Sequence, residues 1–352
     1  PEMIRDAMKK AVDDPNNRGY ADNGIREFKV AAAKYMSSFF SVTDLDPDTE
    51  INHSIGSKPA LAMIPLCFIN PGDVAITTVP GYPVMATHTK YLGGDVFKLA
   101  LRKENSFYPD LSEIPSEIAE KAKLFYVNYP NNPTGAKPSA QFFDALIGFA
   151  QKHNIIIVQD AAYATLVYDG EPISILSRPG GKETSIELHS MSKSYNMTGW
   201  RLGFVAGAKE LVQAYAEVKD NMDSGQFKAI QLAACAGITN KSLADKIKEH
   251  YRKRLTAMTD VLRKAGFDAS MPGGTFYLYV PAPTGAGKVK FASAEEASQY
   301  LIKKHLISTV PWDDAGAFLR FSATFESAGN SDDETILKEL LVRLKAADLK
   351  WT

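Results

Sequence analysis

Residues 155–160 read IIIVQD, and this stretch decides the fold class. Its four consecutive β-branched apolar residues are too few for a buried helix and are typical of a central strand covered on both faces. An amphipathic segment at 139–153 precedes the run and predicts a helix, because its apolar residues recur at helical spacing. A strand that follows such a helix is typical of a β–α–β unit, so the region predicts a parallel sheet.

The same alternation of short apolar runs and longer amphipathic segments extends in both directions from this stretch. Further strands are predicted at 51–55, 73–79, 95–101, 123–129, 185–190 and 202–207. Together with 155–160 they give an α/β fold, in which a mainly parallel seven-stranded sheet lies between helices.

The last hundred residues have a different pattern. A charged amphipathic stretch at 242–265 predicts a long helix that ends at Gly266. Short strands at 275–280, 307–310 and 318–325, helices at 295–304 and 332–347, and a surface loop at 281–288 are predicted after it. The pattern predicts a smaller α/β domain formed by 1–19 and 242–352, beside a large domain formed by 20–241.

Composition excludes several classes of function. The 40 lysines and arginines nearly balance 41 acidic residues, which gives no electrostatic reason to expect nucleic acid or an anionic membrane as partner. No apolar run approaches the roughly 20 residues that span a bilayer. Two cysteines, Cys67 and Cys235, are too few for a disulfide framework and are typical of a reducing compartment. A cytoplasmic protein is therefore expected.

Polar residues follow several of the predicted strands where each one ends. Parallel sheets bind ligands at the carboxyl ends of their strands. Ser57 and Lys58 follow one strand after a glycine, Asn132 follows another in PNNPTG, Asp160 ends a third and Lys193 follows a fourth. Each also has an ordinary structural explanation. Ser57 and Lys58 would lie in a capping turn, and Asn132 in a proline turn. Asp160 would cap a helix, and Lys193 would be a solvated surface lysine.

One ligand accounts for all of these residues together. Pyridoxal phosphate needs a lysine for its aldehyde and an acid for its protonated ring nitrogen, which match Lys193 and Asp160. Its phosphate needs backbone amides at a helix N-terminus and hydroxyl or cationic side chains. Candidates for the remaining contacts are Ser57, Lys58, Ser190, Ser192 and Arg201 at the phosphate, Asn132 and Tyr163 at the ring hydroxyl oxygen, and Tyr82 against the ring face.

Four motifs carry a resemblance to a known family. They are SMSKSYNMTGWRLG at 190–203, NNPTG at 131–135, DAAY at 160–163 and FLRFS at 318–322. In this combination and order the chain resembles the class I/II pyridoxal-phosphate aminotransferases of fold type I. The resemblance implies that Lys193 forms the Schiff base and is the general base, and that Arg320 binds the substrate α-carboxylate. It also implies a homodimer with shared active sites, in which Tyr20 reaches the phosphate of the neighbouring subunit.

Longer sequence segments indicate a particular branch of this family. The segments GYADNGIREFK at 19–29, GSKPALAMIPLCFINPGD at 56–73, PGYPVMATHTKYLGG at 80–94 and DSGQFKAIQLAA at 223–234 resemble LL-diaminopimelate aminotransferases. That branch moves an amino group from LL-2,6-diaminopimelate to 2-oxoglutarate in lysine biosynthesis. Candidates for contacts with the distal end of the substrate are Asp22, Asn23, Lys58 and Ser224, although Asp22 is equally well explained as a turn residue.

Several alternatives remain open from the residues. An aspartate or alanine aminotransferase, or a carbon–sulfur lyase on the same fold, would share the lysine, the acid and the carboxylate-binding arginine. A nucleotide loop at 285–288 (GAGK) fails, because Val289 occupies the Ser/Thr position. The six histidines show no metal-ligand spacing, so no metal is expected. Family members also carry several dozen residues before the first residue here, so an N-terminal arm is expected to be missing.

Overall fold

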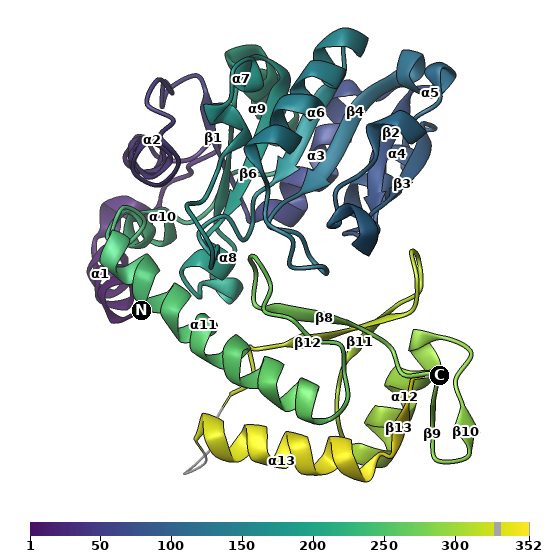
Figure 1. Ribbon diagram of the computed structural model, residues 1–352. Helices are drawn as coiled ribbons and strands as arrows, with labels where there is room; N and C mark the ends of the chain where they lie inside the picture. Colours follow the sequence, from purple (N-terminus) through teal and green to yellow (C-terminus); the bar gives the residue numbers. More distant parts are fainter. Residues whose placement is uncertain (327–331, 352) are drawn as a thin grey trace.

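The computed structural model describes residues 1–326 and 332–351 and consists of two bodies that face each other (Figure 1). Within these residues the larger body contains a seven-stranded sheet with the strand order β1-β7-β6-β5-β4-β2-β3. β7 runs antiparallel to both of its neighbours, and the other paired strands are parallel. The strands are β1 Ile51–Ser54, β2 Val74–Val79, β3 Asp95–Ala100, β4 Ala122–Asn128, β5 Ile156–Asp160, β6 Ser185–Ser190 and β7 Gly203–Gly207.

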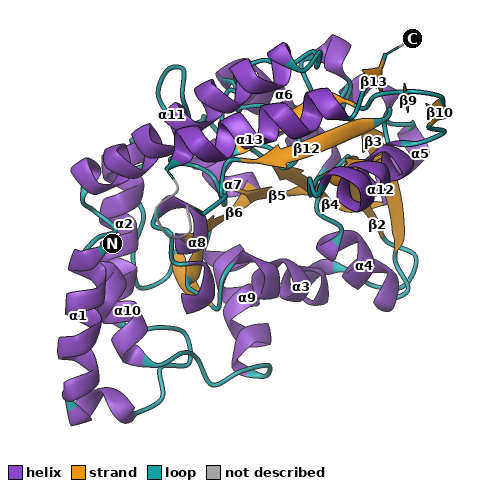
Figure 2. Cartoon of the chain, turned by 90° about the horizontal axis from the view of Figure 1, so that it is seen from below, coloured by secondary structure: helices purple, strands orange, loops and turns teal. Residues whose placement is uncertain are grey.

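Helices cover both faces of this sheet. Successive residues of β4 point to opposite faces: Leu124 and Tyr126 pack against one helical layer, and Phe125 and Val127 lie in the other core. Figure 2 shows α3, α4 and α9 together on one side of the sheet. The helices of the larger body are α2 Arg26–Phe40, α3 Ser57–Phe68, α4 Val84–Tyr91, α5 Ser116–Lys121, α6 Ala140–His153, α7 Gly181–Thr184, α8 Met191–Ser194, α9 Lys209–Asp220 and α10 Lys228–Cys235.

The smaller body is built on a second sheet with the strand order β11-β12-β8. The long helix α11 leads into it, and α12 and α13 pack with this sheet and α11 (Figure 1). A third sheet with the order β10-β9-β13 brings the carboxyl end of the described chain back to the 285–290 segment. The elements are α11 Lys241–Lys264, β8 Tyr277–Pro281, β9 Gly285–Ala286, β10 Val289–Lys290, α12 Ala294–His305, β11 Val310–Trp312, β12 Phe318–Ser322, α13 Asp333–Ala346 and β13 Leu349–Lys350.

The first helix, α1 Glu2–Asp13, packs against α10. Gly237, just after α10, lies so close to Ile4 that an added Cβ would come within 2.7 Å of that side chain. The assignment of residues 1–19 to the smaller domain, and the domain boundaries in general, stay predictions.

The predicted sheet of the larger body is confirmed, with each strand within about one residue of its expected position. Two predictions for the smaller body are wrong. The strand expected at 307–310 is Val310–Trp312, and the expected loop at 281–288 contains β9. Both pairings depend on distant partners, since Val310 lies opposite Arg320 and Ala286 lies opposite Leu349. In the part of the chain that is described, no helix combines the length and apolar character needed to cross a membrane.

Candidate active site

Three neighbouring parallel strands end at the same edge of the large sheet with polar residues. β4 ends at Asn128, β5 at Asp160 and β6 at Ser190, and residue pairing aligns Asn128 with Asp160. This edge faces the smaller body, and α8 lies between the large sheet and the β8–β12 strands (Figure 1). Because α8 carries Lys193, four of the chemically distinctive residues converge on one region.

Asp160 is a buried carboxyl group with incomplete hydrogen bonding. It is 6% exposed, and its Oδ2 accepts a hydrogen bond of 3.4 Å from the Tyr126 hydroxyl. Among the described residues nothing bonds its Oδ1. Burial raises the pKa of Asp160 to about 7, against the opposing effects of the Ala162 amide, Tyr126 and Lys193. A cationic ring N–H is the kind of partner that would satisfy Oδ1 and keep the carboxylate charged.

Asn128 organises the neighbourhood of Asp160 and was missed by the sequence reasoning. Its Nδ2 donates to the backbone oxygen of Asp160 at 2.7 Å, and its Oδ1 accepts from the backbone N–H of Asn132 at 2.9 Å. The side chain is 2% exposed. Its position as the last residue of a buried strand, next to NNPTG, is the signal that would have found it.

Lys193 lies on a short helix, α8, which directly follows β6. Ser190 caps this helix, because its hydroxyl oxygen accepts a hydrogen bond of 3.2 Å from the backbone N–H of Ser192. The Lys193 ammonium lies 5.7 Å from the centre of the Phe276 ring. Burial, followed by the charges of Arg201 and Arg320, lowers the pKa of Lys193, so its amine is more easily deprotonated than that of a surface lysine.

Arg201 lies beside the N-terminus of α3. Its Nη1 donates to the hydroxyl of Ser192 at 3.2 Å and to the backbone oxygen of Thr198 at 2.8 Å. A Cβ added to Gly56 would lie 2.4 Å from Arg201 Nη2, so only glycine lets the guanidinium approach this closely. Ser57, the first residue of α3, is buried, and its hydroxyl has no partner in the described part of the chain.

Arg320 reaches the same region from β12 of the smaller body. Its Nη1 donates to Asn132 Oδ1 at 2.5 Å, and its Cζ lies 4.0 Å from the centre of the Tyr277 ring. The Tyr163 hydroxyl lies 3.3 Å from the Tyr277 hydroxyl, so Tyr277 touches both predicted site residues. Burial raises the pKa of Tyr163 well above its ordinary value, which keeps its hydroxyl protonated.

The residues fit pyridoxal phosphate. Across the described residues, Asp160 Oδ1, Ser57 Oγ and Arg320 Nε are buried polar atoms without partners, and they come from three of the predicted contacts. A buried polar atom without a partner is costly, and pyridoxal phosphate with its substrate would supply partners for these three atoms. Tyr82 is half-buried against the α3–α4 core, and Lys58 is exposed in the first turn of α3.

Apart from Lys58 in α3, the residues predicted to meet the distal end of the substrate or a second subunit lie on two adjacent loops. A bridge between Ala21 and Gly225 joins them, and the fully buried Lys219 ammonium bonds the backbone oxygen of Asp22 and, at 2.5 Å, the Asp223 carboxylate. On these loops Tyr20 is 82% exposed, and Asp22 and Ser224 are also exposed.

Asn23 is already engaged within its own chain. Its Nδ2 donates to Asp220 at 2.6 Å, and its Oδ1 accepts from Asn52 at 2.7 Å. These bonds tie its loop to α9 and β1. Asn23 therefore has one amide hydrogen left for a ligand.

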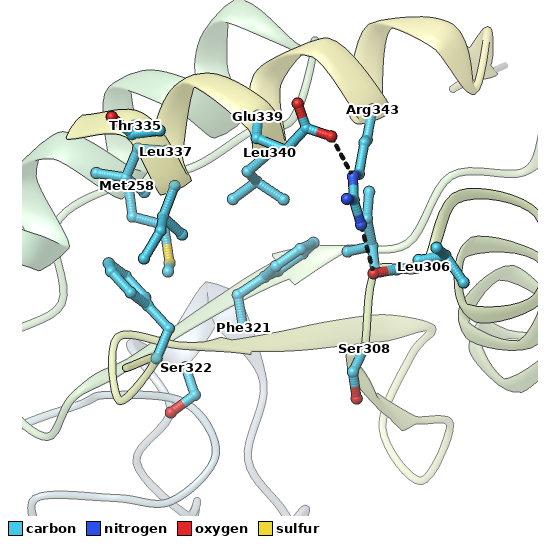
Figure 3. A pocket seen from close by; sticks show the side chains of 13 residues that line it. Met258, Leu306, Ser308, Phe321, Ser322, Thr335, Leu337, Glu339, Leu340 and Arg343 are labelled. Carbon is cyan, nitrogen blue, oxygen red and sulfur yellow. Dashed lines mark hydrogen bonds and ion pairs between the residues drawn. The ribbon is translucent and has the colours of Figure 1, made fainter. Parts of the chain in front are cut away.

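Two cavities are lined by residues of the smaller body. A cavity of about 870 Å³ opens beside Lys193 and is lined by residues of both bodies, including Trp200, Tyr251, Phe276 and Tyr277. A second cavity, of about 510 Å³, lies between α13 and β12, where Figure 3 shows Met258, Leu337, Leu340 and Phe321 turned toward one another. None of the predicted site residues lines the second cavity.

Within residues 1–326 and 332–351, no group of three or more His, Cys, Asp or Glu side chains is arranged to hold a metal ion.

Comparison with known proteins gives a consistent picture. Residues 1–330 match the family model for aminotransferase class I and II. The LL-diaminopimelate aminotransferase of Methanocaldococcus jannaschii is 51% identical over 100% of this chain and 86% of its own length. The enzyme of that name from Methanococcus maripaludis is 51% identical over 97% of this chain and 83% of its own.

Solved structures agree with this picture. The substrate-bound BacF structure from Bacillus subtilis has a TM-score of 0.93 and 31% identity, covering 100% of this chain and 88% of that one. Class I and II aminotransferases use pyridoxal phosphate. This chain belongs to the class I and II aminotransferase family and is a pyridoxal-phosphate-dependent transaminase.

Proposed function

We propose that this aminotransferase moves an amino group from LL-2,6-diaminopimelate to 2-oxoglutarate and so acts in lysine biosynthesis. The observation that carries the choice of substrate is the 51% identity, over the whole chain, to a relative named for that reaction. A second relative of the same name at 51% identity supports it. The chemistry itself rests on Lys193, Asp160 and Arg320, which are gathered at one sheet edge.

We assign the phosphate of the cofactor to the N-terminus of α3 and the α8 region. The first turn of a helix leaves backbone N–H groups free for an anion. The hydroxyls of Ser57 and Ser190 add neutral donors, and Arg201 adds a charged one. Ser192 accepts a bond from Arg201 and so orients it. Lys58, in the same turn, is the outermost of these groups.

We assign the pyridine ring of the cofactor to the carboxyl ends of β4 and β5. Asp160 holds the proton on the ring nitrogen, since its unpaired Oδ1 is available for that bond. Asn132 and Tyr163 hold the ring hydroxyl oxygen, and Tyr82 covers the ring face. Bound pyridoxal phosphate supplies an electron sink for the negative charge that develops at the substrate α-carbon.

The remaining steps belong to side chains that touch the substrate. Arg320 binds the α-carboxylate with two parallel N–H donors, a geometry that a guanidinium provides. Lys193, with its lowered pKa, would take the proton from the substrate α-carbon as general base and would deliver it to the C4′ carbon of the bound cofactor. The Phe276 ring lies 5.7 Å from the Lys193 amine and borders the cavity in which that amine lies.

The distal amine and carboxylate of the substrate are assigned to Asp22, Asn23, Lys58 and Ser224. Asp22 and Ser224 lie on outward-facing loops, so some of these contacts are made across the interface of a homodimer. The exposed Tyr20 is assigned to the phosphate of the partner subunit in the same assembly. We infer a cytoplasmic enzyme whose partners are small amino and oxo acids.

Visible absorption of the purified protein tests cofactor, reaction and substrate together. LL-diaminopimelate should bleach the yellow colour of the bound cofactor, and 2-oxoglutarate should restore it. The DD isomer is the matched control and should leave the colour unchanged. Bleaching by aspartate or alanine with no response to LL-diaminopimelate would overturn the choice of substrate. Pyruvate released from cystathionine without an oxo acid would identify a carbon–sulfur lyase instead.

A further inference from the structure

Arg201 has an unusual backbone that the surrounding chain must hold in place. Its φ of +55° and ψ of 55° lie in the left-handed region, which residues other than glycine rarely adopt. This conformation turns the guanidinium back over Gly56 and toward Ser192. A relaxed backbone at Arg201 would move the guanidinium away from the N-terminus of α3.

A single glutamine side chain, Gln226, fixes this backbone. Its Nε2 donates to the backbone oxygen of Trp200 at 2.9 Å and to that of Arg201 at 2.7 Å. Both amide hydrogens are thereby used, on two consecutive carbonyl groups. No other side chain in the described residues is recorded as bonding these two oxygens.

The glutamine is itself held in one orientation by buried neighbours. Its Oε1 accepts a hydrogen bond of 3.1 Å from Nε2 of His53, which is fully buried on β1. Burial lowers the pKa of His53 to about 4, so the ring is neutral and carries its hydrogen on Nε2. Gln231, also fully buried, donates to the Gln226 backbone oxygen at 2.9 Å and accepts from the Ile25 N–H at 2.8 Å.

We propose that Gln226 is a positioning residue that holds Arg201 in its phosphate-binding conformation. This inference rests on the proposed assignment of Arg201 to the cofactor phosphate. Gln226 does not touch the cofactor and acts only through the backbone of residues 200–201. Its effect should therefore fall on the phosphate and leave the contacts to the ring unchanged.

Pyridoxal, which lacks the phosphate, separates this role from a general structural one. The full-length chain is freed of cofactor and titrated with pyridoxal phosphate and with pyridoxal, following absorbance and protein fluorescence. Gln226→Met keeps the length of the side chain and removes its donors. We expect the Kd for pyridoxal phosphate to rise about 10-fold, as for the loss of a well-placed hydrogen-bonding group, and the Kd for pyridoxal to change less than about twofold.

Two further variants complete the experiment. Gln213→Met alters an exposed glutamine of α9 and should change neither Kd. In an Arg201→Met background, Gln226→Met should raise the Kd for pyridoxal phosphate by less than about a further twofold, because the guanidinium that Gln226 positions is gone. If Gln226→Met does not fold, Gln226→Glu provides the same comparison, since it keeps the acceptor for His53 and loses the donors.

The outcomes distinguish this inference from the proposed function. An unchanged Kd for pyridoxal phosphate, or an equal rise for both compounds, would refute the positioning role. A full effect of Gln226→Met in the Arg201→Met background would also refute it. If the unsubstituted protein binds pyridoxal phosphate no better than pyridoxal, the assignment of the phosphate site fails before Gln226 is tested.

Discussion

Arg320 of β12 donates a hydrogen bond of 2.5 Å to the side-chain oxygen of Asn132, which follows β4. The two residues are 188 positions apart and belong to different bodies of the molecule. With the Tyr277 ring 4.0 Å away, the guanidinium is held on one face and at one nitrogen. Among the described residues its Nε has no hydrogen-bond partner, and the contacts to Asn132 and Tyr277 orient the group before a carboxylate arrives.

Arg320→Lys should mainly weaken the use of substrate. Lysine keeps the charge and loses the two parallel donors, so kcat/KM should fall about 100-fold. Stopped-flow bleaching of the cofactor colour measures this, and titration with pyridoxal phosphate should give an almost unchanged Kd. Arg343→Lys, on α13 beside the second cavity, is the matched control. Equal losses in substrate use and cofactor affinity would contradict the assignment to the substrate carboxylate.

Lys193→Ala should stop transamination while leaving cofactor binding partly intact. Loss of a general base costs about 100-fold to 10,000-fold, and loss of the covalent link adds to it. Single-turnover assays measure the rate, and dialysis measures the retained cofactor. Lys241→Ala, at the start of α11, should behave like the unsubstituted enzyme. Near-native turnover by Lys193→Ala would show that another group moves the proton.

Asp160→Asn should change how the stability of the cofactor-free protein depends on pH. Since burial raises the pKa of Asp160 from 3.8 to about 7, the folded state keeps a proton that the unfolded state releases between these values. The free energy of unfolding therefore falls as pH rises, by about 1.4 kcal/mol per unit, and this loss is complete above the folded-state pKa.

The asparagine variant lacks this loss, so it should be more stable than the unsubstituted protein near pH 8 and gain little near pH 4. Urea unfolding at several pH values measures the difference. Asp144→Asn, which removes a surface carboxyl with a lowered pKa, should give no such gain. A gain that is the same at all pH values would mean that Asp160 is ionised throughout.

Gly56→Ala should weaken cofactor binding by displacing Arg201. The new Cβ would lie 2.4 Å from Arg201 Nη2, at a residue whose φ is +79°. We expect a rise in the Kd for pyridoxal phosphate of about 10-fold or more, together with a loss of about 1 kcal/mol in stability. Gly72→Ala separates the two effects, because Gly72 has a φ of +87° and nothing within 4 Å. A similar loss of affinity in both variants would point to backbone strain alone.

Mixed dimers of Lys193→Ala and Tyr20→Ala subunits test whether active sites are shared. If Tyr20 serves the neighbouring site, a mixed dimer has one site with both defects and one intact site. An equal mixture should then recover about a quarter of native activity, because about half of its dimers are mixed. Size-exclusion chromatography with light scattering checks assembly. No recovery, with mixed dimers present, would mean that Tyr20 serves the site of its own subunit.

The strands of the larger body could be predicted well because each one has a recognisable local pattern of apolar residues. Runs such as IIIVQD are buried on both faces, and helix α6 lies where the amphipathic segment at 139–153 predicted a helix. The smaller body was harder, because Pro311 lies inside a strand and β9 has only two residues. Such strands exist through pairing with distant segments, which no local pattern reveals.

The residues of the candidate site also differ in how readily the sequence indicates them. Lys193, Asp160, Asn132 and Arg320 were predicted from contiguous motifs, and the structure brings them to one region between the two bodies, while their roles stay predictions. Gln226 was not singled out, since a glutamine in a polar loop has no periodic signal. Its partner His53 lies 173 positions away, and only the fold shows that the two side chains meet.

The neutral His53 has a consequence for how the enzyme tolerates acidity. With its pKa near 4, the link from β1 to the Arg201 backbone keeps one protonation state from mildly acidic to alkaline conditions. Asp160, with a pKa of about 7 before the cofactor binds, responds to small changes in the same range. On the proposed assignments, the support for the phosphate-binding arginine is therefore insensitive to pH in this range, while the charge of the carboxyl assigned to the ring nitrogen changes with pH.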